Sequence, residues 1–349
     1  MAKIEKLFGF IDEKWFVTDL KENRLGHIKL AFVREVINPL IVRSTDMEAT
    51  VTLVTIDDRE IVEIPPRKMK SREKLLGLML CREFDVVDEK VRYNVFEGAE
   101  MLNNPNSALF GDTSTKSGDT AGLTSRAIYD WAYSLRDVKD ITEKLQHNAL
   151  SEAGTMIDEA TGEMRQSLYS TEYILPDTFF PHFITVDNIT PELFVHLLLC
   201  VLNQHRYGAQ TTTNANNMRN HLVAIGVADF EKPINSYTIS KAWNEAKSKE
   251  KPKLKTVKDY VCSQMTSHYS AEVLEQDVVG LVKWINDLWT ENDKTSLKAI
   301  YSSAKKSVDN YLKSIKMVKE SAGDKKQKGS KKGKEAKAEG DNENSTPES

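Results

Sequence analysis

Residues 175–227 decide the fold and read LPDTFFPHFITVDNITPELFVHLLLCVLNQHRYGAQTTTNANNMRNHLVAIGV. The first part is a β-branched and aromatic run, which predicts a strand. Thr190 and Pro191 have the residue types of an N-cap and a first helical turn, and they predict a helix that runs to Asn203. Residues 222–227 predict a second strand. A strand, helix, loop and strand in this order predict one half of a ferredoxin-like split βαβ fold.

The other half of this unit is predicted nearer the N-terminus. Residues 26–37 alternate between apolar and polar side chains and are rich in β-branched ones, which indicates a strand. The Pro65-Pro66 pair marks a boundary, and residues 74–82 behind it carry an apolar stripe at helical spacing. Two strand-and-helix halves of this kind predict an α+β protein with a ferredoxin-like core.

Two further segments predict structure outside this core. Residues 49–56 and 60–64 are joined by the turn-forming Asp57-Asp58 pair, which predicts a pair of strands. Residues 140–176 predict a long hairpin with few side chains that could form a core. Because a hairpin without its own hydrophobic face is unstable alone, we expect it to lie against a partner chain or a nucleic acid.

These segments divide the chain into three regions. Residues 1–240 are expected to form the core, with a helical insertion at 65–135 and the hairpin at 140–176. Residues 241–320 have a helical and charged pattern, which predicts a C-terminal helical region. Residues 321–349 are rich in Lys, Gly, Ser and Glu, and we expect this charged tail to be disordered because it cannot bury a core.

The composition predicts a soluble protein of a reducing compartment. Charged residues make up 29% of the 349 residues, and no apolar run is long enough for a transmembrane helix. The N-terminus has no signal-peptide pattern. The cysteines Cys81, Cys200 and Cys262 are far apart, which indicates free thiols and a cytoplasmic location. Because the net charge is −4, any nucleic-acid site must be a local basic patch.

The polar stretch between the predicted helix and the last strand is the first candidate for function. Residues 205–221 contain two Arg, two His, three Thr and four Asn, with no Asp or Glu. Loops held by a rigid scaffold often carry binding residues, and this set of side chains suits a polyanion. A solvated polar loop is the alternative interpretation.

Basic and hydroxyl residues of three separated segments predict an RNA-binding surface. If these segments meet on one face of the sheet, Arg, Lys, Thr and main-chain amides would contact phosphates, and bases would stack on Tyr207. An ordinary RRM is excluded, because the aromatic RNP1 pattern is missing. The candidate RNA-binding residues are Arg43, Arg67, Lys68, Lys70, Arg72, Arg206, Tyr207, Gly208, Gln210, Thr211, Thr212, Asn214, Arg219 and His221.

The chain lacks the motifs of zinc enzymes, of serine hydrolases and of P-loop proteins. There is no Cys-x-x-Cys and no His-Glu-x-x-His, and we expect His205 and His221 to form hydrogen bonds or to contact phosphate rather than to bind zinc. There is no Gly-x-Ser-x-Gly, and the polar loop at residues 113–122 lacks the spacing of a P-loop. Asp46 could hold a divalent ion for phosphodiester cleavage, although Asp in this setting is more often a turn cap.

Several short motifs are similar to those of one protein family. They are Tyr207-Gly208-Ala209-Gln210-Thr211-Thr212, Pro176-Asp177-Thr178-Phe179-Phe180-Pro181, Asn104-Pro105 with Leu109-Phe110-Gly111, residues 67–82, and Asn220-His221-Leu222-Val223. Over roughly residues 27–235 the chain resembles the backbone subunit of type I-D CRISPR-Cas effector complexes. This resemblance implies an RRM-like core with insertions, a lid within residues 65–135 and a thumb hairpin at 140–176.

The resemblance also implies partners. Copies of the chain would form a helical filament along one guide RNA (crRNA), contact the other subunits of the complex, and present the guide to a target DNA or RNA strand. Related subunits of type III complexes cut the paired strand, so metal-dependent cleavage with Asp46 is the alternative, and a free-standing single-strand binding protein is a third interpretation. Zinc-ligating cysteines of some family members would fall near residues 103–106, where this chain has Asn and Pro. We therefore expect no metal and no cofactor, and no membrane partner.

Overall fold

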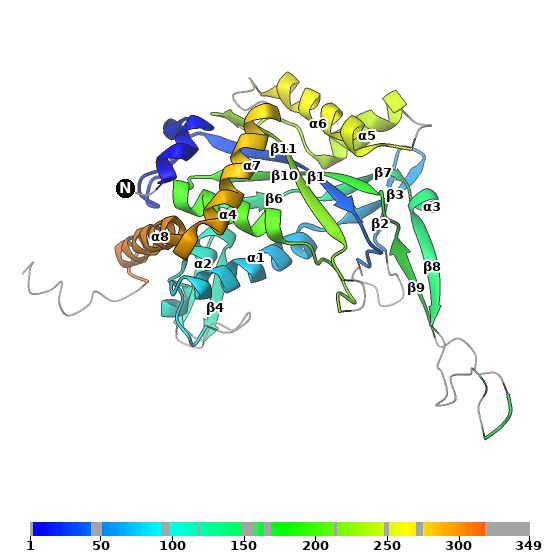
Figure 1. The fold of residues 1–349 in the computed structure, drawn as a ribbon, viewed down its shortest axis with the longest axis horizontal. Helices are drawn as coiled ribbons and strands as arrows, with labels where there is room; N and C mark the ends of the chain where they lie inside the picture. The colour runs from blue at the N-terminus through cyan, green and yellow to red at the C-terminus, as the bar shows by residue number, and fades with distance from the viewer. Residues whose placement is uncertain are drawn as a thin grey trace, which may run out of the picture.

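A four-stranded antiparallel sheet forms the centre of the computed structural model (Figure 1). The structure describes residues 3–42, 51–91, 98–116, 119–147, 157, 160–163, 169–212, 215–247, 251–269 and 275–317. The strands of the sheet are β1 (His27–Val36), β6 (Ala127–Tyr129), β10 (Phe179–Asp187) and β11 (Met218–Ala228). They lie in the order β11-β1-β10-β6.

Two helices connect these strands in the expected way. The chain runs from β1 through α1 (Pro66–Glu83) to β6, and from β10 through α4 (Pro191–Asn203) to β11. This is the β-α-β-β-α-β topology of a ferredoxin-like fold, so the predicted α+β class and core are confirmed.

Helix α4 shows why the sequence prediction succeeds here. The Thr190 side chain accepts a hydrogen bond from the Leu193 amide, and Pro191 takes the first helical position, where its missing N–H costs nothing. The helix is buried from Leu193 to Val201, because the sheet lies on one side and other helices lie on the other. Strand β11 starts at Met218, earlier than predicted, so Arg219 and His221 belong to a strand and not to a loop.

Helices cover both faces of the sheet. Leu30 and Phe32 face one core, which α1, α4, α7 (Glu275–Thr290) and α8 (Thr295–Ser314) complete. Ala31 and Val33 face a second core under α5 (Ser236–Lys247) and α6 (Leu254–His268). The predicted C-terminal helical region is therefore divided between the two faces. Among the described residues, aliphatic and aromatic packing occupies both faces of the sheet, so the described basic segments do not meet on an open sheet face.

The insertions carry small sheets of their own. Strands β2 (Leu53–Ile56) and β3 (Arg59–Ile64) pair through the Asp57-Asp58 turn, as predicted, and β7 (Ala132–Asp137) extends this sheet. The polar segment predicted as a loop is instead a hairpin of β4 (Asp112–Lys116) and β5 (Asp119–Leu123). Its Thr, Ser and Gly residues pair through the backbone, which the hydrophobic pattern did not indicate.

The long hairpin projects from the body of the protein (Figure 1). Its arms are β8 (Thr142–His147) and β9 (Tyr169–Ile174), which confirms the two predicted extended arms. The short helices are α2 (Pro105–Phe110), α3 (Val138–Ile141) and the 3-10 turns Lys3–Gly9, Glu13–Trp15, Ala99–Leu102 and Asn292–Lys294. Within the described residues, no helix combines the length and apolar character that crossing a bilayer requires. The predicted tail lies outside the described residues.

Candidate nucleic-acid interface

The polar loop, helix α1 and the chain after β1 meet at one end of the central sheet. The Arg72 side chain on α1 donates a hydrogen bond through Nη2 to the Gly208 carbonyl oxygen at 2.8 Å. The Ala209 amide donates to the Ile41 carbonyl oxygen, also at 2.8 Å. Three segments that are distant in sequence are therefore joined by direct hydrogen bonds, although at the end of the sheet and not on its face.

Gly208 is required by this close approach. Its φ is +73°, in the left-handed region that favours glycine. A Cβ atom at this position would lie 2.1 Å from the Ile41 carbonyl oxygen. Backbone cannot yield as a flexible side chain would, so only glycine lets the loop contact residues 40–42.

Asn217 fixes the shape of the loop from inside. Its side-chain Oδ1 accepts from the Tyr207 amide at 3.0 Å, and its Nδ2 donates to the Tyr207 carbonyl oxygen at 2.9 Å. The Asn217 amide also donates to the His205 carbonyl oxygen at 2.8 Å. The Asn38 side chain closes the outer edge by donating to the Asn216 carbonyl oxygen at 2.6 Å. The two ends of the loop are thus held together by pairs of hydrogen bonds.

A buried polar network anchors the loop to the core. Arg34 of β1 and Glu73 of α1 are fully buried and form an ion pair of 2.7 Å. The Tyr207 hydroxyl donates to Glu73 Oε1 at 2.7 Å and accepts from Asn220 Nδ2 at 2.7 Å. The Tyr129 hydroxyl donates to the other oxygen of Glu73. Burial, and then the charge of Glu73, raises the pKa of both tyrosines far above the usual range, so both remain protonated donors.

Tyr207 consequently has a different role from the predicted one. Its side chain is only 2% exposed, so it has no free ring face on which a base could stack. The prediction of base stacking on Tyr207 is wrong, because the hydroxyl group is drawn into the core by Glu73, Asn220 and Arg34. Tyr207 is an anchor of the loop.

The basic residues of α1 point in two directions. Lys68 and Arg72 are one helical turn apart and share a face, and Arg72 contacts the loop. Arg67 is exposed, while burial, and then the neighbouring Arg67 charge, lowers the pKa of Lys68. Lys70 faces the other way, because its Nζ donates to Ser125 Oγ at 2.6 Å and to the Ala127 carbonyl oxygen at 3.0 Å.

Lys70 therefore connects α1 to strand β6 and to Ser125 just before it. Burial lowers its pKa to about 8. Its hydrogen bonds are made within the protein and not toward the loop, so its place among the RNA-binding residues stays a prediction. Lys74, in the same direction, binds Asp112 and the Gly111 carbonyl oxygen.

The first residues of β11 add a charged pair beside the loop. Arg219 is 57% exposed, and its Nη1 lies 3.9 Å from Glu35 Oε2. His221 Nε2 lies 2.8 Å from the same oxygen and donates to it. Burial lowers the pKa of His221, with smaller contributions in the same direction from Lys258 and Arg219, while the bond to Glu35 opposes the shift. His221 thus orients Glu35 and leaves Arg219 on the surface.

The remaining candidates divide into described and undescribed residues. Arg206 and Thr212 are exposed, Thr211 is half-buried, and Gln210 has a left-handed φ of +53° in the same loop. Arg43, Asp46 and Asn214 lie outside the described residues. Within the described ranges, no group of three or more His, Cys, Asp or Glu side chains could hold a metal ion.

Sequence reasoning missed the residues that hold the interface in place, namely Arg34, Asn38, Glu73, Asn217 and Asn220. Arg34 did carry a signal, since it is a cation between apolar residues on a strand expected to be buried, and a buried charge requires a partner. Its partners could not be found, because Glu73 and Asn220 are 39 and 186 residues away.

The assembled surface suits the backbone of a nucleic acid. Arg67, Arg206 and Arg219 are exposed guanidinium groups, which bind phosphate in a planar, bidentate way. Arg206 and Arg219 lie near the two ends of a polar stretch that has exposed hydroxyl and amide groups and no carboxylate. Such groups position a ribose-phosphate chain and do not distinguish one base from another.

Comparisons with known proteins agree with this fold. The crystal structure of Thermofilum pendens Csc2 is similar with a TM-score of 0.61 and 15% sequence identity, over 90% of this chain and 99% of that chain. A chain of a "CRISPR RNA-guided surveillance complex, pre-nicking" has a TM-score of 0.47 and 11% identity, over 68% of this chain and 87% of that chain. A chain of a "CRISPR RNA-guided surveillance complex" has a TM-score of 0.44 and 13% identity, over 67% and 82%.

No curated protein sequence matches the chain. The sequence model of the family described as Csc2 Crispr matches residues 28–309, which is most of the 349 residues and includes the sheet, the loop and the helices on both faces. The chain therefore belongs to the Csc2 CRISPR family.

Proposed function

We propose that this protein is the guide-RNA-binding backbone subunit of a type I-D CRISPR interference complex. Copies of it would assemble along the RNA and present the guide for pairing with a target strand. Membership of the Csc2 CRISPR family supports a role in such a complex. The interface at the end of the sheet supports RNA as the direct ligand.

The observation that carries this proposal is a loop without carboxylates that hydrogen bonds hold at both ends and that exposed arginines flank. The loop is held by Asn217, by Gly208 against residue 41, and by the buried network under Tyr207. Preorganised groups bind with less loss of conformational entropy. Contacts to phosphate and ribose tolerate any guide sequence, which a guide-holding subunit requires because base pairing provides the specificity.

The projecting hairpin supports assembly into a filament. Leu145 on β8 is exposed, as is Ile157 between the two arms. The arms pair with each other over residues 142–147 and 169–174, and among the described residues only the base of β9 is tied to the body, through the bridge between Ile174 and Leu40. A two-stranded hairpin is marginal in water. A contact with RNA or with the next copy of the chain would stabilise it. If the hairpin of one copy binds a different surface of the next copy, the contact is heterologous. Contacts of this kind generate an open helical filament.

The test compares a double variant with a charge-matched control. Arg206→Ala with Arg219→Ala removes two exposed cations of the interface, and Lys283→Ala with Lys298→Ala removes two exposed cations of α7 and α8. Fluorescence anisotropy with two guide RNAs of unrelated sequence, over a series of salt concentrations, gives the affinity and its salt dependence. For single strands each lost phosphate contact should reduce the salt slope by about 0.7, hence by about 1.4 for the interface variant.

The proposal requires similar losses for both RNAs and little change in the control. A loss confined to one guide sequence would mean that the arginines read bases. An equal loss in the α7 and α8 control would mean that the interface is not where the RNA binds.

A further inference from the structure

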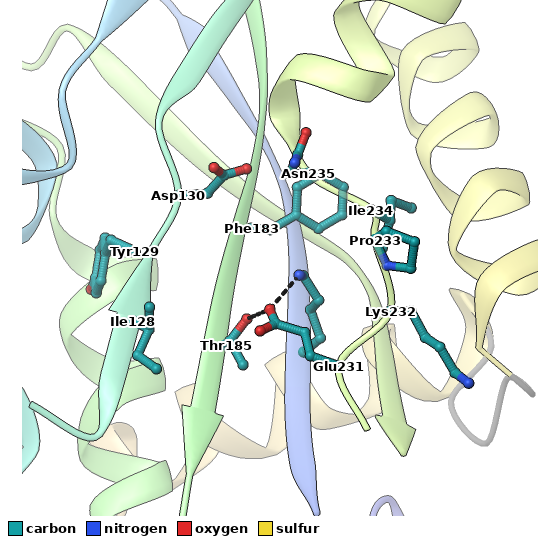
Figure 2. A pocket seen from close by; sticks show the side chains of 11 residues that line it. Ile128, Tyr129, Asp130, Phe183, Thr185, Glu231, Lys232, Pro233, Ile234 and Asn235 are labelled. Carbon is teal, nitrogen blue, oxygen red and sulfur yellow. Dashed lines mark hydrogen bonds and ion pairs between the residues drawn. The ribbon is translucent and has the colours of Figure 1, made fainter. Parts of the chain in front are cut away.

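Cations on the sheet face under α5 and α6 differ in whether they have partners. In the pocket between β1, β10 and residues 231–235 (Figure 2), the Lys29 Nζ lies 2.8 Å from Glu231 Oε1, and the Thr185 hydroxyl donates to the same oxygen at 2.7 Å. The charge of this lysine is therefore neutralised within the protein.

The lysines at the start of α6 have no such partners. Residues 247–258 contain six lysines and one acidic residue. Lys253 and Lys255 are exposed, and Lys258 is half-buried. Their side chains form neither an ion pair nor a hydrogen bond with a described residue. These three cations can therefore bind an anion from outside the chain.

Helix α6 starts at the same end of the central sheet as the polar loop. The Lys251 Nζ lies 3.3 Å from Asp177 Oδ2, and the Asp177 amide donates to the Val36 carbonyl oxygen at the end of β1. Just after the other end of α6, the Tyr269 hydroxyl lies 3.0 Å from His27 Nε2 at the start of β1. The helix therefore runs back along the sheet, and its first turns lie at the end where the loop contacts the chain after β1.

Arg219 lies on the face of the sheet that α6 covers. Val33 is opposite His221 in the pairing of β1 with β11, and Arg219 precedes His221 by two residues, so both point to the same face. Val33 packs in the second core with Val257 of α6, and Lys258 follows Val257. Burial lowers the pKa of His221, and the charges of Lys258 and Arg219 lower it further. Lys258 and Arg219 therefore both lie near His221, one on the helix and one on the strand.

Acidic side chains offset only part of this positive charge. Asp177 pairs with Lys251, and Glu35 lies 3.9 Å from Arg219. Asp259, which follows Lys258 on α6, is exposed. It is a single carboxylate beside the three lysines without partners, so the start of α6 is a positive surface although the net charge of the chain is −4.

The spacing of these lysines suits a chain of phosphates. Lys255 and Lys258 are three residues apart, so they are neighbours on one side of the helix and lie about 4.5 Å apart along its axis. A nucleic-acid strand in a duplex carries one phosphate per about 3.4 Å of its axis. Each lysine can therefore reach a different phosphate, and its flexible stem with three N–H donors tolerates any base sequence.

We propose that the phosphate backbone of a nucleic acid continues from Arg219 onto the first turns of α6, where Lys255 and Lys258 bind it. The strand is either the guide RNA itself or the target strand paired with it, since both present the same phosphates. This contact would extend the nucleic-acid surface of each copy beyond the polar loop. The inference rests on the proposed binding of RNA at that loop.

The test uses Lys255→Ala with Lys258→Ala in the full chain. Fluorescence anisotropy over a series of salt concentrations is measured with a guide RNA alone and with the same RNA paired to a complementary DNA strand. With single-stranded RNA the double variant should lower the salt slope by about 1.4, and Lys255→Ala alone by about 0.7. Lys255→Arg with Lys258→Arg keeps both charges and should bind as the wild type does. If the loss of Lys258 perturbs the fold, Lys255→Ala alone carries the test, because Lys255 is exposed.

The two RNA samples identify the strand that α6 binds. A lower slope with the unpaired RNA assigns the contact to the guide, and a lower slope only with the paired RNA assigns it to the target strand. An unchanged slope with both samples, or an equal loss in the α7 and α8 control, would overturn the inference. If the Arg206 and Arg219 variant still loses affinity in that case, only the α6 contact fails. If that variant also binds as the wild type does, the proposed function fails with it.

Discussion

Replacement of Tyr207 by phenylalanine tests whether this residue anchors the loop through its hydroxyl group or stacks on a base through its ring. The variant keeps the aromatic ring and removes only the hydroxyl group. That hydroxyl donates to Glu73 at 2.7 Å and accepts from Asn220 at 2.7 Å and from Arg34 at 3.2 Å. If Tyr207 stacked on a base, phenylalanine would serve equally well. If Tyr207 anchors the loop, loss of the hydroxyl group lowers the free energy of unfolding.

The size of the effect follows from these contacts. A hydrogen bond to a charged group contributes about 1.5–3 kcal/mol, and Glu73 loses one such donor in a fully buried setting. Asn220 retains two backbone acceptors, the carbonyl oxygens of Val201 and Gln204, so its share is small. We expect the free energy of unfolding to fall by about 2–3 kcal/mol, with a melting temperature lower by roughly 2 °C per kcal/mol for a chain of this size.

Chemical denaturation at neutral pH measures the change in the free energy of unfolding. Tyr237→Phe is the matched control, because that tyrosine is exposed and its hydroxyl group makes no hydrogen bond among the described residues; its effect should stay within about 0.5 kcal/mol. RNA affinity of Tyr207→Phe should remain near that of the wild type well below the melting temperature, because Asn217 and Arg72 still hold the loop. A variant as stable as the wild type would refute the anchor.

Two further predictions concern the loop and acid stability. Gly208→Ala should lower the free energy of unfolding by about 2 kcal/mol or more and weaken RNA binding. The control Gly162→Ala, also at positive φ but with nothing within 4 Å of the new Cβ, should lower it by only about 1 kcal/mol. Equal losses of the two variants in chemical denaturation would argue against the close contact of Gly208. Burial lowers the pKa of His196 to about 3. Below pH 6.5 the unfolded state therefore binds more protons than the folded state. When the pH falls from 7 to 5, this residue should lower the free energy of unfolding by about 2 kcal/mol. His196→Gln should flatten that acid limb in denaturation curves, and an unchanged limb would contradict the assignment.

The core was predictable because its signals are local. The cap at Thr190, the apolar helix behind it and the β-branched strands on either side are each readable within a few residues of the sequence. Their combination leaves few topologies open, since connections are short and adjacent elements pack together. Helix α1 begins at Pro66, earlier than the predicted residues 74–82, because proline suits the first turn of a helix. Helical spacing would have separated Lys70 and Lys74 from Lys68 and Arg72.

The sequence marked the loop of the candidate interface but not the contacts that hold this loop in place. The absence of carboxylates marked residues 205–221, and the resemblance marked Tyr207 and Gly208. The burial of Tyr207 depends on Arg34, Glu73 and Asn220, which lie far apart in the sequence. No local pattern reports such a contact, so an aromatic residue among polar neighbours was assigned to the surface.

The buried ion pair explains how a weakly acidic protein can hold a cationic loop in one shape. Burying Arg34 and Glu73 costs desolvation energy, and an apolar pair would give equal or greater stability. Breaking the pair destabilises the fold, however, because a buried charge would lose its partner. The fold therefore opposes any movement of Tyr207 that disturbs Glu73. The pair is neutral as a unit and adds no attraction for RNA. Under the proposed function, affinity for RNA would come from the exposed arginines of each copy and would add up along the filament, while the core beneath each loop sets its shape.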